Sequence, residues 1–362
     1  MKNVTDNNVS SFWQKPFAHA LIIALVGLFV YSETFSVPFL FDDASGISEN
    51  PLVKDLKNFL SIEGFKNNIS NTRFIGYLSF AINYKIHGVE LAGYHAVNLV
   101  IHIINALLVY YLIIFSFRTP VLKDSLLKHR TRHIAFFAAL LFVCHPIQTQ
   151  AVTYIVQRFA SLAALFYLLS VVLYVKWRLD RKCESGSEKS EDKESKSSWL
   201  WYAGALLSAV LAMKTKEISF TLPVAIAVYE FMFFEEKSKK RILFLVPFIV
   251  TMLIIPFSMI NLNKPVGSIM DDVDTSTRVQ TLLSRPDYLF TQVRVIMTYI
   301  RLFFFPINQN LDYDYPPSHS LFEPEVFMSL LFLAAIVSVS IYLLVKSGEK
   351  ISERRLISFG IF

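Results

Sequence analysis

Residues 17–43 read FAHALIIALVGLFVYSETFSVPFLFDD, an apolar run that ends in two adjacent carboxylates. The part from Phe17 to Val37 has about the 20 residues that a membrane-spanning helix needs, and Pro38 ends it. Like charges this close raise one another's pKa, so a protein keeps such a pair where it binds a cation, takes up a proton or holds a hydroxyl. The alternative is that Asp42 and Asp43 only cap and solvate the end of the helix.

The composition points to a polytopic membrane protein. The chain has 362 residues, of which 54% are hydrophobic and 15% aromatic, and this is too apolar for a soluble domain of that length. The net charge of +6 comes from basic residues gathered in loops between apolar runs, so we expect a lipid bilayer and no nucleic acid as partner. Cys144 lies in an apolar run and Cys183 in a charged loop, which argues against a disulfide.

The pattern of apolar runs and basic loops predicts an all-α fold with eight full spans, a partial ninth at residues 356–362 and one re-entrant or interfacial helix at residues 288–305. Four basic segments are expected to face the cytoplasm, at residues 118–133, 176–198, 237–241 and 346–355. Residues 38–93, with the Asp pair, then form the first extracytoplasmic loop, and residues 178–198 a cytoplasmic low-complexity loop. We treat residues 1–362 as one membrane domain, truncated at its C-terminus. We expect a bacterial cell membrane, with the endoplasmic reticulum membrane as the alternative.

Two apolar runs look too short to cross a membrane. Residues 134–144 give about 16 Å of helix and residues 199–213 about 22 Å, against a hydrocarbon core of about 30 Å. The loops at residues 145–150 and 214–217 must then dip below the outer surface. Polar backbone at that depth is tolerated only inside protein or along a wet cavity, so the sequence predicts an outward-opening cavity on the side of the Asp pair.

Cations near that side are candidates for binding a phosphate group. They are Arg73, Arg158, Lys214, Lys216, Arg294 and Arg301. Basic residues at membrane depth are functional candidates by default, although each one alone can also extend to the lipid headgroups. A carboxylate base with several cations suits a reaction that releases a phosphate. The stripe His95, Asn98, His102 and Asn105 is instead expected to join helices, and we assign it no metal.

Six segments, taken in order, resemble the N-terminal membrane domain of the GT-C O-mannosyltransferases that carry tetratricopeptide repeats. They read FLFDD at 39–43, RFIGYLSFAINY at 73–84, GYHAVNL at 93–99, HPIQTQAV at 145–152, KE at 216–217 and YIRLF at 299–303. The resemblance covers nearly the whole chain. The chain departs from it at Gln148 and Gln150, where His and Glu are expected in the animal members, and no repeat domain follows.

This resemblance implies a GT-C membrane glycosyltransferase that moves a sugar, mannose among the candidates, from a polyprenyl-phosphate carrier to a protein or glycan hydroxyl. By resemblance the pair supplies the catalytic acid, with Asp43 favoured over Asp42. The six cations, chosen for their charge and position, are expected to bind the donor phosphate. Glu49, His145, Gln148 and Glu217 are expected to contact the acceptor or the sugar. We expect no cofactor, and a divalent cation at the Asp pair stays open.

The rival interpretation is a transporter or lipid-binding protein whose outward cavity releases its ligand unchanged. Such a fold predicts internal repeats with broken helices at matching places in two halves. The sequence shows one candidate re-entrant helix and no twofold repeat, which favours the enzyme.

Overall fold

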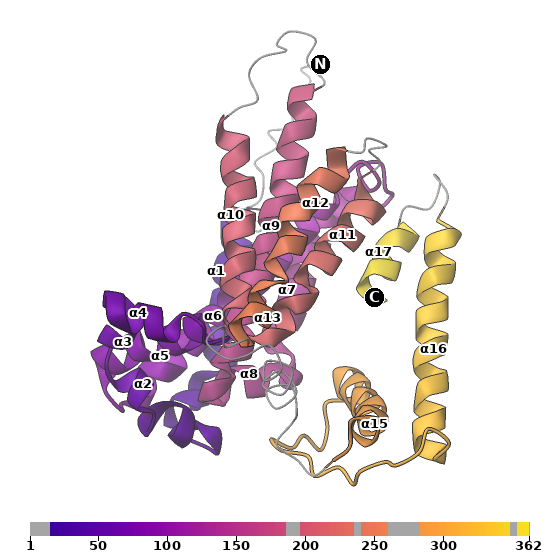
Figure 1. Ribbon diagram of the computed structural model, residues 1–362. Helices are drawn as coiled ribbons and strands as arrows, with labels where there is room; N and C mark the ends of the chain where they lie inside the picture. Colours follow the sequence, from indigo (N-terminus) through magenta and orange to yellow (C-terminus); the bar gives the residue numbers. More distant parts are fainter. Residues whose placement is uncertain (1–14, 186–195, 235–239, 260–282, 348–352, 362) are drawn as a thin grey trace, which may run out of the picture.

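The computed structural model describes residues 15–185, 196–234, 240–259, 283–347 and 353–361. In these residues the regular structure is helical, without a β-strand, and the predicted all-α class is confirmed. Five helices form the main bundle: α1 (Pro16–Val30), α6 (Leu91–Ser116), α7 (Thr131–Cys144), α9 (Arg158–Ser185) and α10 (Lys196–Met213). Helix α9 packs between α6 and α10, and α6 also packs on α1 and α7 (Figure 1).

The remaining elements are shorter or lie outside the main bundle. Helix η2 (Ser32–Ser36) precedes the first loop, which contains η3 (Ala44–Ser48), α2 (Pro51–Lys54), α3 (Lys57–Leu60), α4 (Ile62–Asn68) and α5 (Phe74–His87). The later elements are η4 (Lys128–Arg130), η5 (Pro146–Gln148), α8 (Thr149–Thr153), η6 (Ile155–Gln157), η7 (Glu217–Thr221), α11 (Leu222–Phe233), α12 (Lys240–Thr251), α13 (Ile254–Met259), α15 (Arg285–Phe304), α16 (Pro324–Val345) and α17 (Glu353–Ile361).

The polar stripe on α6 joins this helix to its neighbours, as predicted. His95 Nε2 lies 2.9 Å from the Val37 carbonyl, and His102 Nε2 lies 3.2 Å from the carbonyl of Val143. The amide nitrogen of Asn105 donates to the Ser161 carbonyl at 2.9 Å. The carbonyl of Val143 lies in the last turn of α7, where the helix itself offers no donor; the carbonyl of Ser161, in the first turn of α9, accepts the Asn105 amide as an added bond between helices.

Within the described residues, four helices are long and apolar enough to cross a membrane: Leu91–Ser116, Ile155–Arg181, Arg241–Met259 and Pro324–Val345. The bent pair Lys128–Cys144 and Pro146–Thr153, with a bend of 51°, makes a fifth if it is one span. The expected eight full spans are therefore not confirmed. One reason is that the run starting at Phe17 is α-helical only to Val30 and continues as the 3₁₀ helix η2.

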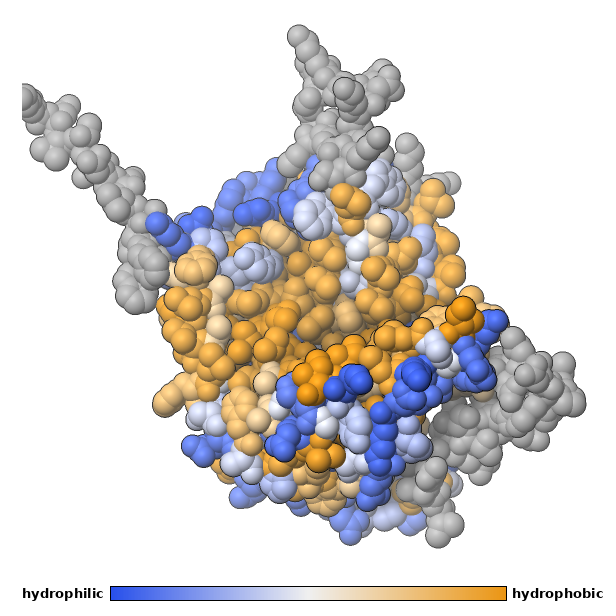
Figure 2. Space-filling model, turned by 90° about the vertical axis from the view of Figure 1, so that its left-hand side faces the viewer, coloured by the Kyte–Doolittle hydropathy of each residue, from blue (hydrophilic) through white to orange (hydrophobic). Residues whose placement is uncertain are grey.

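The surface supports a membrane protein. Figure 2 shows a broad apolar belt around the middle of the molecule, with hydrophilic residues above and below it. Side chains such as Phe17, Leu200 and Phe332 are exposed in the isolated chain. Burying them against lipid tails removes the cost of hydrating them.

Two of the expected boundaries move in the structure. Helices α7 and α10 each begin three residues before the apolar runs 134–144 and 199–213, because polar residues continue the helix. The expected loop 178–198 is partly helical, since α9 continues to Ser185 and α10 begins at Lys196; residues 186–195 lie outside the described part. Helix α15, expected to be re-entrant or interfacial, is not among the candidate spans and runs transverse to α16 in Figure 1.

Candidate active site

The two carboxylates at residues 42 and 43 lie in different environments. Asp43 is fully buried, and both of its carboxylate oxygens accept backbone hydrogen bonds: Oδ2 from the amide of Leu40 at 2.9 Å and Oδ1 from the amide of Val156 at 2.7 Å. Burial raises the pKa of Asp43 above its usual value, and these amides offset part of that rise. Asp43 therefore fastens the first loop to the start of α9.

Asp42, by contrast, is exposed. The preceding residue, Phe41, has a φ of 40°, a left-handed conformation that is uncommon outside glycine. This kink lies immediately before the two carboxylates, one at the surface and the other inside. The backbone amide of Asp42 donates to the Tyr154 hydroxyl oxygen at 3.0 Å.

Tyr154 supports the exposed carboxylate. Burial raises the pKa of Tyr154, and the negative charges of Asp42 and Asp43 raise it further. Its hydroxyl consequently stays protonated at neutral pH. A protonated phenol can donate to an anion beside it, so Tyr154 can hold the carboxylate of Asp42 in place.

Asp42 lines a cleft of about 600 Å³ between the first loop, the segment that precedes α9, and α15 with the loop that follows it. Tyrosines, glutamines and aspartates dominate its wall. The other lining residues are Phe41, Gln150, Tyr154, Gln157, Leu283, Tyr288, Thr291, Gln292, Val295, Thr298, Tyr299, Leu311, Asp312, Tyr313, Asp314 and Tyr315. A cleft of this size, with aromatic faces and many paired donors and acceptors, suits a ligand rich in hydroxyl groups.

The six cations do not gather at this cleft: the described residues that line it include no lysine or arginine. Arg158 is fully buried. Its guanidinium donates to Asn98 Oδ1 at 2.7 Å, to Asn83 Oδ1 at 2.9 Å and to the carbonyl of Tyr94 at 3.0 Å, and stacks over Phe80. Arg158 therefore ties α9 to α5 and α6 rather than facing a ligand.

A second group of expected site residues meets beside α5, at the end of α10. The guanidinium of Arg73 lies 3.3 Å from the Glu217 carboxylate, which also accepts from Thr72 at 2.8 Å. The ammonium of Lys214 donates to the carbonyl of Ile69 at 2.7 Å. Burial and the nearby charge of Arg73 lower the pKa of Lys216, so this half-buried ammonium would gain from an anion.

This cation group adjoins the anchor of Asp43. Arg73 lies over the ring of Phe159, 5.5 Å from its centroid, and Phe159 is one helical turn after Val156. Helix η6 therefore carries the amide that binds Asp43, and the start of α9, directly after it, carries a ring that contacts the cation group. Tyr154 and Gln157, from the same segment, line the cleft.

The remaining expected residues lie apart from the cleft wall. Arg294 pairs with Glu325 and donates to Ser318 at 2.9 Å, which fastens α15 to α16 and its preceding loop. Arg301 donates to the carbonyl of Ile307 at 3.2 Å. The ring of His145 stacks on Phe303, and its Nε2 lies 2.9 Å from that residue's carbonyl. Glu49 is exposed and Gln148 half-buried, and neither lines the cleft.

Sequence reasoning did not single out most of the cleft wall. Tyr154 and Gln157 had a usable signal, because they lie between two helical runs and follow the segment HPIQTQ. The aspartates and tyrosines of the segment DYDY at 312–315 read only as an acidic outer loop. No group of three or more His, Cys, Asp or Glu residues in the described part of the chain could hold a metal ion.

Comparison with known proteins places the chain among relatives of one activity. It is 30% identical over 235 residues to protein O-mannosyl-transferase TMTC2 of Homo sapiens, a match that covers 62% of this chain and 25% of that protein. Further curated relatives carry the same name, protein O-mannosyl-transferase. Protein O-mannosyl-transferase F38B6.6 of Caenorhabditis elegans is 33% identical over 44% of this chain, and TMTC4 of Mus musculus is 28% identical over 59%.

The expected resemblance to the O-mannosyltransferases is thereby confirmed, although these matches cover 44–62% of the chain and not nearly all of it. The chain spans about a quarter of the length of these O-mannosyl-transferases: 25% of TMTC2, 23% of the nematode protein and 29% of mouse TMTC4. No family model matches the chain, and no solved structure matches it.

Proposed function

We propose that the chain is the membrane part of a glycosyltransferase that moves a sugar from a polyprenyl-phosphate carrier to a hydroxyl group of a protein on the extracytoplasmic face. The observation that carries the proposal is the exposed Asp42 in a cleft rich in tyrosine, glutamine and aspartate. The printed names of the relatives, protein O-mannosyl-transferases, support mannose as the sugar and a protein as the acceptor.

The chemistry assigns different tasks to the two carboxylates. Asp42 takes the proton of the acceptor hydroxyl, and the resulting oxygen attacks the anomeric carbon of the sugar. The bond from that carbon to the carrier phosphate breaks as the new bond forms, with inversion. Asp43, whose oxygens are both occupied by amides, holds the loop that carries Asp42. The proposal thus moves the base from Asp43, which the sequence favoured, to Asp42, because a base must reach the hydroxyl.

The carrier phosphate leaves as a weak base and needs no general acid. We place it toward Arg73, Lys214 and Lys216, the cation group next to the start of α9. Burial lowers the pKa of Lys216, and an approaching phosphate would restore the charged form and be stabilised by it. Arg158, Arg294 and Arg301 keep structural roles in this scheme, since each is bonded to neighbouring helices or loops.

The test measures transfer of labelled mannose from a synthetic polyprenyl-phosphate mannose to acceptor protein by the full-length purified enzyme. Asp42→Asn should reduce turnover by about 10²-fold or more, the usual loss of a general base, while donor binding stays near that of the wild type. Asp55→Asn, an exposed carboxylate change in the same loop, is the matched control. Wild-type turnover in Asp42→Asn refutes the assignment. A wild-type protein that binds the donor and releases it unchanged supports the transporter interpretation instead.

A further inference from the structure

A second cavity lies at the opposite end of α6 from the first loop. It has a volume of about 350 Å³ and is lined by nine residues: His19, Ile114, Phe117, Arg118, Lys128, His129, Thr131, Arg132 and His133. We call it the basic pocket. Because α6 has 26 residues, its two ends are about 39 Å apart, so the basic pocket and the Asp42 cleft belong to opposite sides of the membrane.

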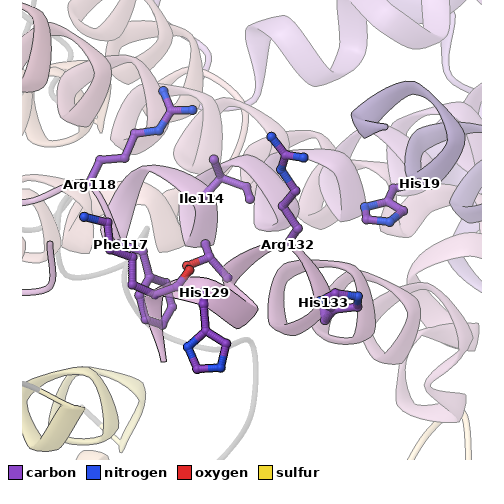
Figure 3. A pocket seen from close by; sticks show the side chains of 9 residues that line it. His19, Ile114, Phe117, Arg118, His129, Arg132 and His133 are labelled. Atoms are coloured by element: carbon purple, nitrogen blue, oxygen red, sulfur yellow. The ribbon is translucent and has the colours of Figure 1, made fainter. Parts of the chain in front are cut away.

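The wall of the basic pocket carries positive charge and no negative charge. Arg118 and Arg132 contribute guanidinium groups and Lys128 an ammonium group, three histidine rings also line the wall, and none of the nine residues is acidic. Figure 3 shows the guanidinium groups of Arg118 and Arg132 with Ile114 between them. Guanidinium groups bind phosphate oxygens through two parallel hydrogen bonds.

Helix ends add to this field. His19 lies in the first turn of α1, and Thr131, Arg132 and His133 are the first residues of α7. The N-terminal end of a helix carries a partial positive charge and favours an anion. Residues of two such ends, His19 of α1 and Thr131 of α7, line the basic pocket. The C-terminal end of α6, at Ile114 and Phe117, lies there too and offsets part of this field.

The position of the basic pocket selects a lipid as the source of the anion. It lies where the apolar parts of α1, α6 and α7 end, which is the level of lipid headgroups. Half-buried Ile114 gives the wall an apolar part that a free phosphate ion would leave uncovered, whereas Phe117 is already packed into the core. A phospholipid can place its phosphate on the cations and its glycerol and upper acyl chain against Ile114.

We propose that the basic pocket binds the phosphate of an anionic phospholipid with a small headgroup, in the leaflet opposite the sugar-transfer cleft. Basic pockets between transmembrane helices on the cytoplasmic side bind phosphate headgroups by this combination of charge and depth. This assignment concerns a site remote from Asp42 and does not depend on the transfer reaction.

The test uses the full chain, purified and placed in nanodiscs of phosphatidylcholine with or without phosphatidic acid. Native mass spectrometry counts the lipid that stays bound after transfer to detergent. The wild type should retain phosphatidic acid in preference to phosphatidylcholine. Replacing two lining cations, Arg118→Gln with Arg132→Gln, should weaken that binding about 30-fold, the loss expected for two cations near a lipid surface.

The matched control removes the same charge from the same face outside the basic pocket. Lys123→Gln with Arg130→Gln changes two exposed cations that do not line it. This control should change binding by less than about threefold. An equal loss in both double variants would show general surface attraction and overturn the site, as would wild-type binding in the pocket variant. If the pocket variant is not monodisperse, Lys128→Gln alone replaces it, with an expected loss of about fivefold.

Inorganic phosphate separates the two sources of the anion. In detergent without lipid, millimolar phosphate should bind more weakly than phosphatidic acid, because it leaves Ile114 without a contact. Binding of inorganic phosphate as tight as that of the lipid, with the same sensitivity to Arg118→Gln and Arg132→Gln, would overturn the lipid assignment in favour of a soluble phosphate.

Discussion

Replacing Asp43 by asparagine should destabilise the protein, whereas the same change at Asp42 should not. The carboxylate of Asp43 accepts one amide on each oxygen, from Leu40 and Val156. Asparagine keeps one acceptor oxygen and turns an NH₂ group toward the other amide, so one charge-assisted hydrogen bond is lost. That loss costs about 1.5–3 kcal/mol. Removing the buried negative charge offsets part of this cost, and we expect a net loss of about 1–2 kcal/mol in the free energy of unfolding.

The difference in stability between the wild type and Asp43→Asn should depend on pH in one direction. Burial holds the pKa of Asp43 above its value in the unfolded chain, so the folded protein takes up this proton more readily. The stability contribution of Asp43 is therefore fully present at acidic pH and falls as pH rises through its folded pKa. The wild type should gain stability relative to Asp43→Asn as pH falls from 7 toward about 4.

Thermal unfolding in detergent, followed by intrinsic fluorescence over that pH range, measures both effects. Asp42→Asn serves as the matched control, because its exposed side chain should change stability by no more than about 0.5 kcal/mol. The reasoning is refuted if Asp43→Asn unfolds with the wild type at every pH. It is also refuted if Asp43→Asn keeps its stability and abolishes transfer while Asp42→Asn transfers normally, since the roles would then be exchanged.

Three further changes follow from contacts beside the site. Arg158→Met leaves the side-chain oxygens of Asn98 and Asn83 without a buried donor and should lower the free energy of unfolding by about 3 kcal/mol or more. Size-exclusion chromatography should then show loss of monodisperse protein, whereas the exposed control Arg301→Met should elute like the wild type. Gly76→Ala places a methyl group 2.2 Å from Phe159 Cδ1 and should destabilise the chain by about 1–3 kcal/mol, while Gly360→Ala, with open space around it, should melt like the wild type. Hydrogen bonds and the charge of Arg73 hold the pKa of Glu217 below its usual value despite burial. The stability that ionised Glu217 contributes is therefore present above its pKa in the unfolded chain and is lost as the pH falls through its pKa in the folded protein. A Glu217→Gln variant whose melting temperature declines with acid as steeply as that of the wild type would contradict this.

Part of this arrangement could be predicted from local sequence patterns. Length, apolar runs and basic loops were enough for an all-α membrane protein, because hydrophobic burial and helix geometry act over short stretches. The stripe from His95 to Asn105 also behaved as its spacing predicted, joining α6 to its neighbours. Two adjacent carboxylates after an apolar run marked the Asp pair as a candidate site, and its catalytic role stays a prediction.

The direction of each side chain could not be predicted in this way. Sequence spacing treats Asp42 and Asp43 alike, yet a single left-handed residue precedes them, with one at the surface and the other buried. The six cations were expected to share one cavity because they share one side of the membrane. Arg158 instead donates hydrogen bonds to two asparagines and one carbonyl of other helices, and these partners are 60 to 75 residues away in the sequence. Such long-range pairs leave no periodic signal.

The bond between Asp43 and the amide of Val156 also affects how the protein is made. Its two partners are separated by 113 residues, and chains are synthesised at about 5–20 residues per second. We infer that the first loop therefore waits about 6–20 s before it can close, while α5, α6 and α7 leave the ribosome. During that interval Asp43 is hydrated, and the cleft that depends on it does not exist. Ribosome-stalled chains ending before and after residue 156, once it has cleared the exit tunnel, should differ in protease cleavage of residues 38–50; equal cleavage would mean that the loop closes on its own.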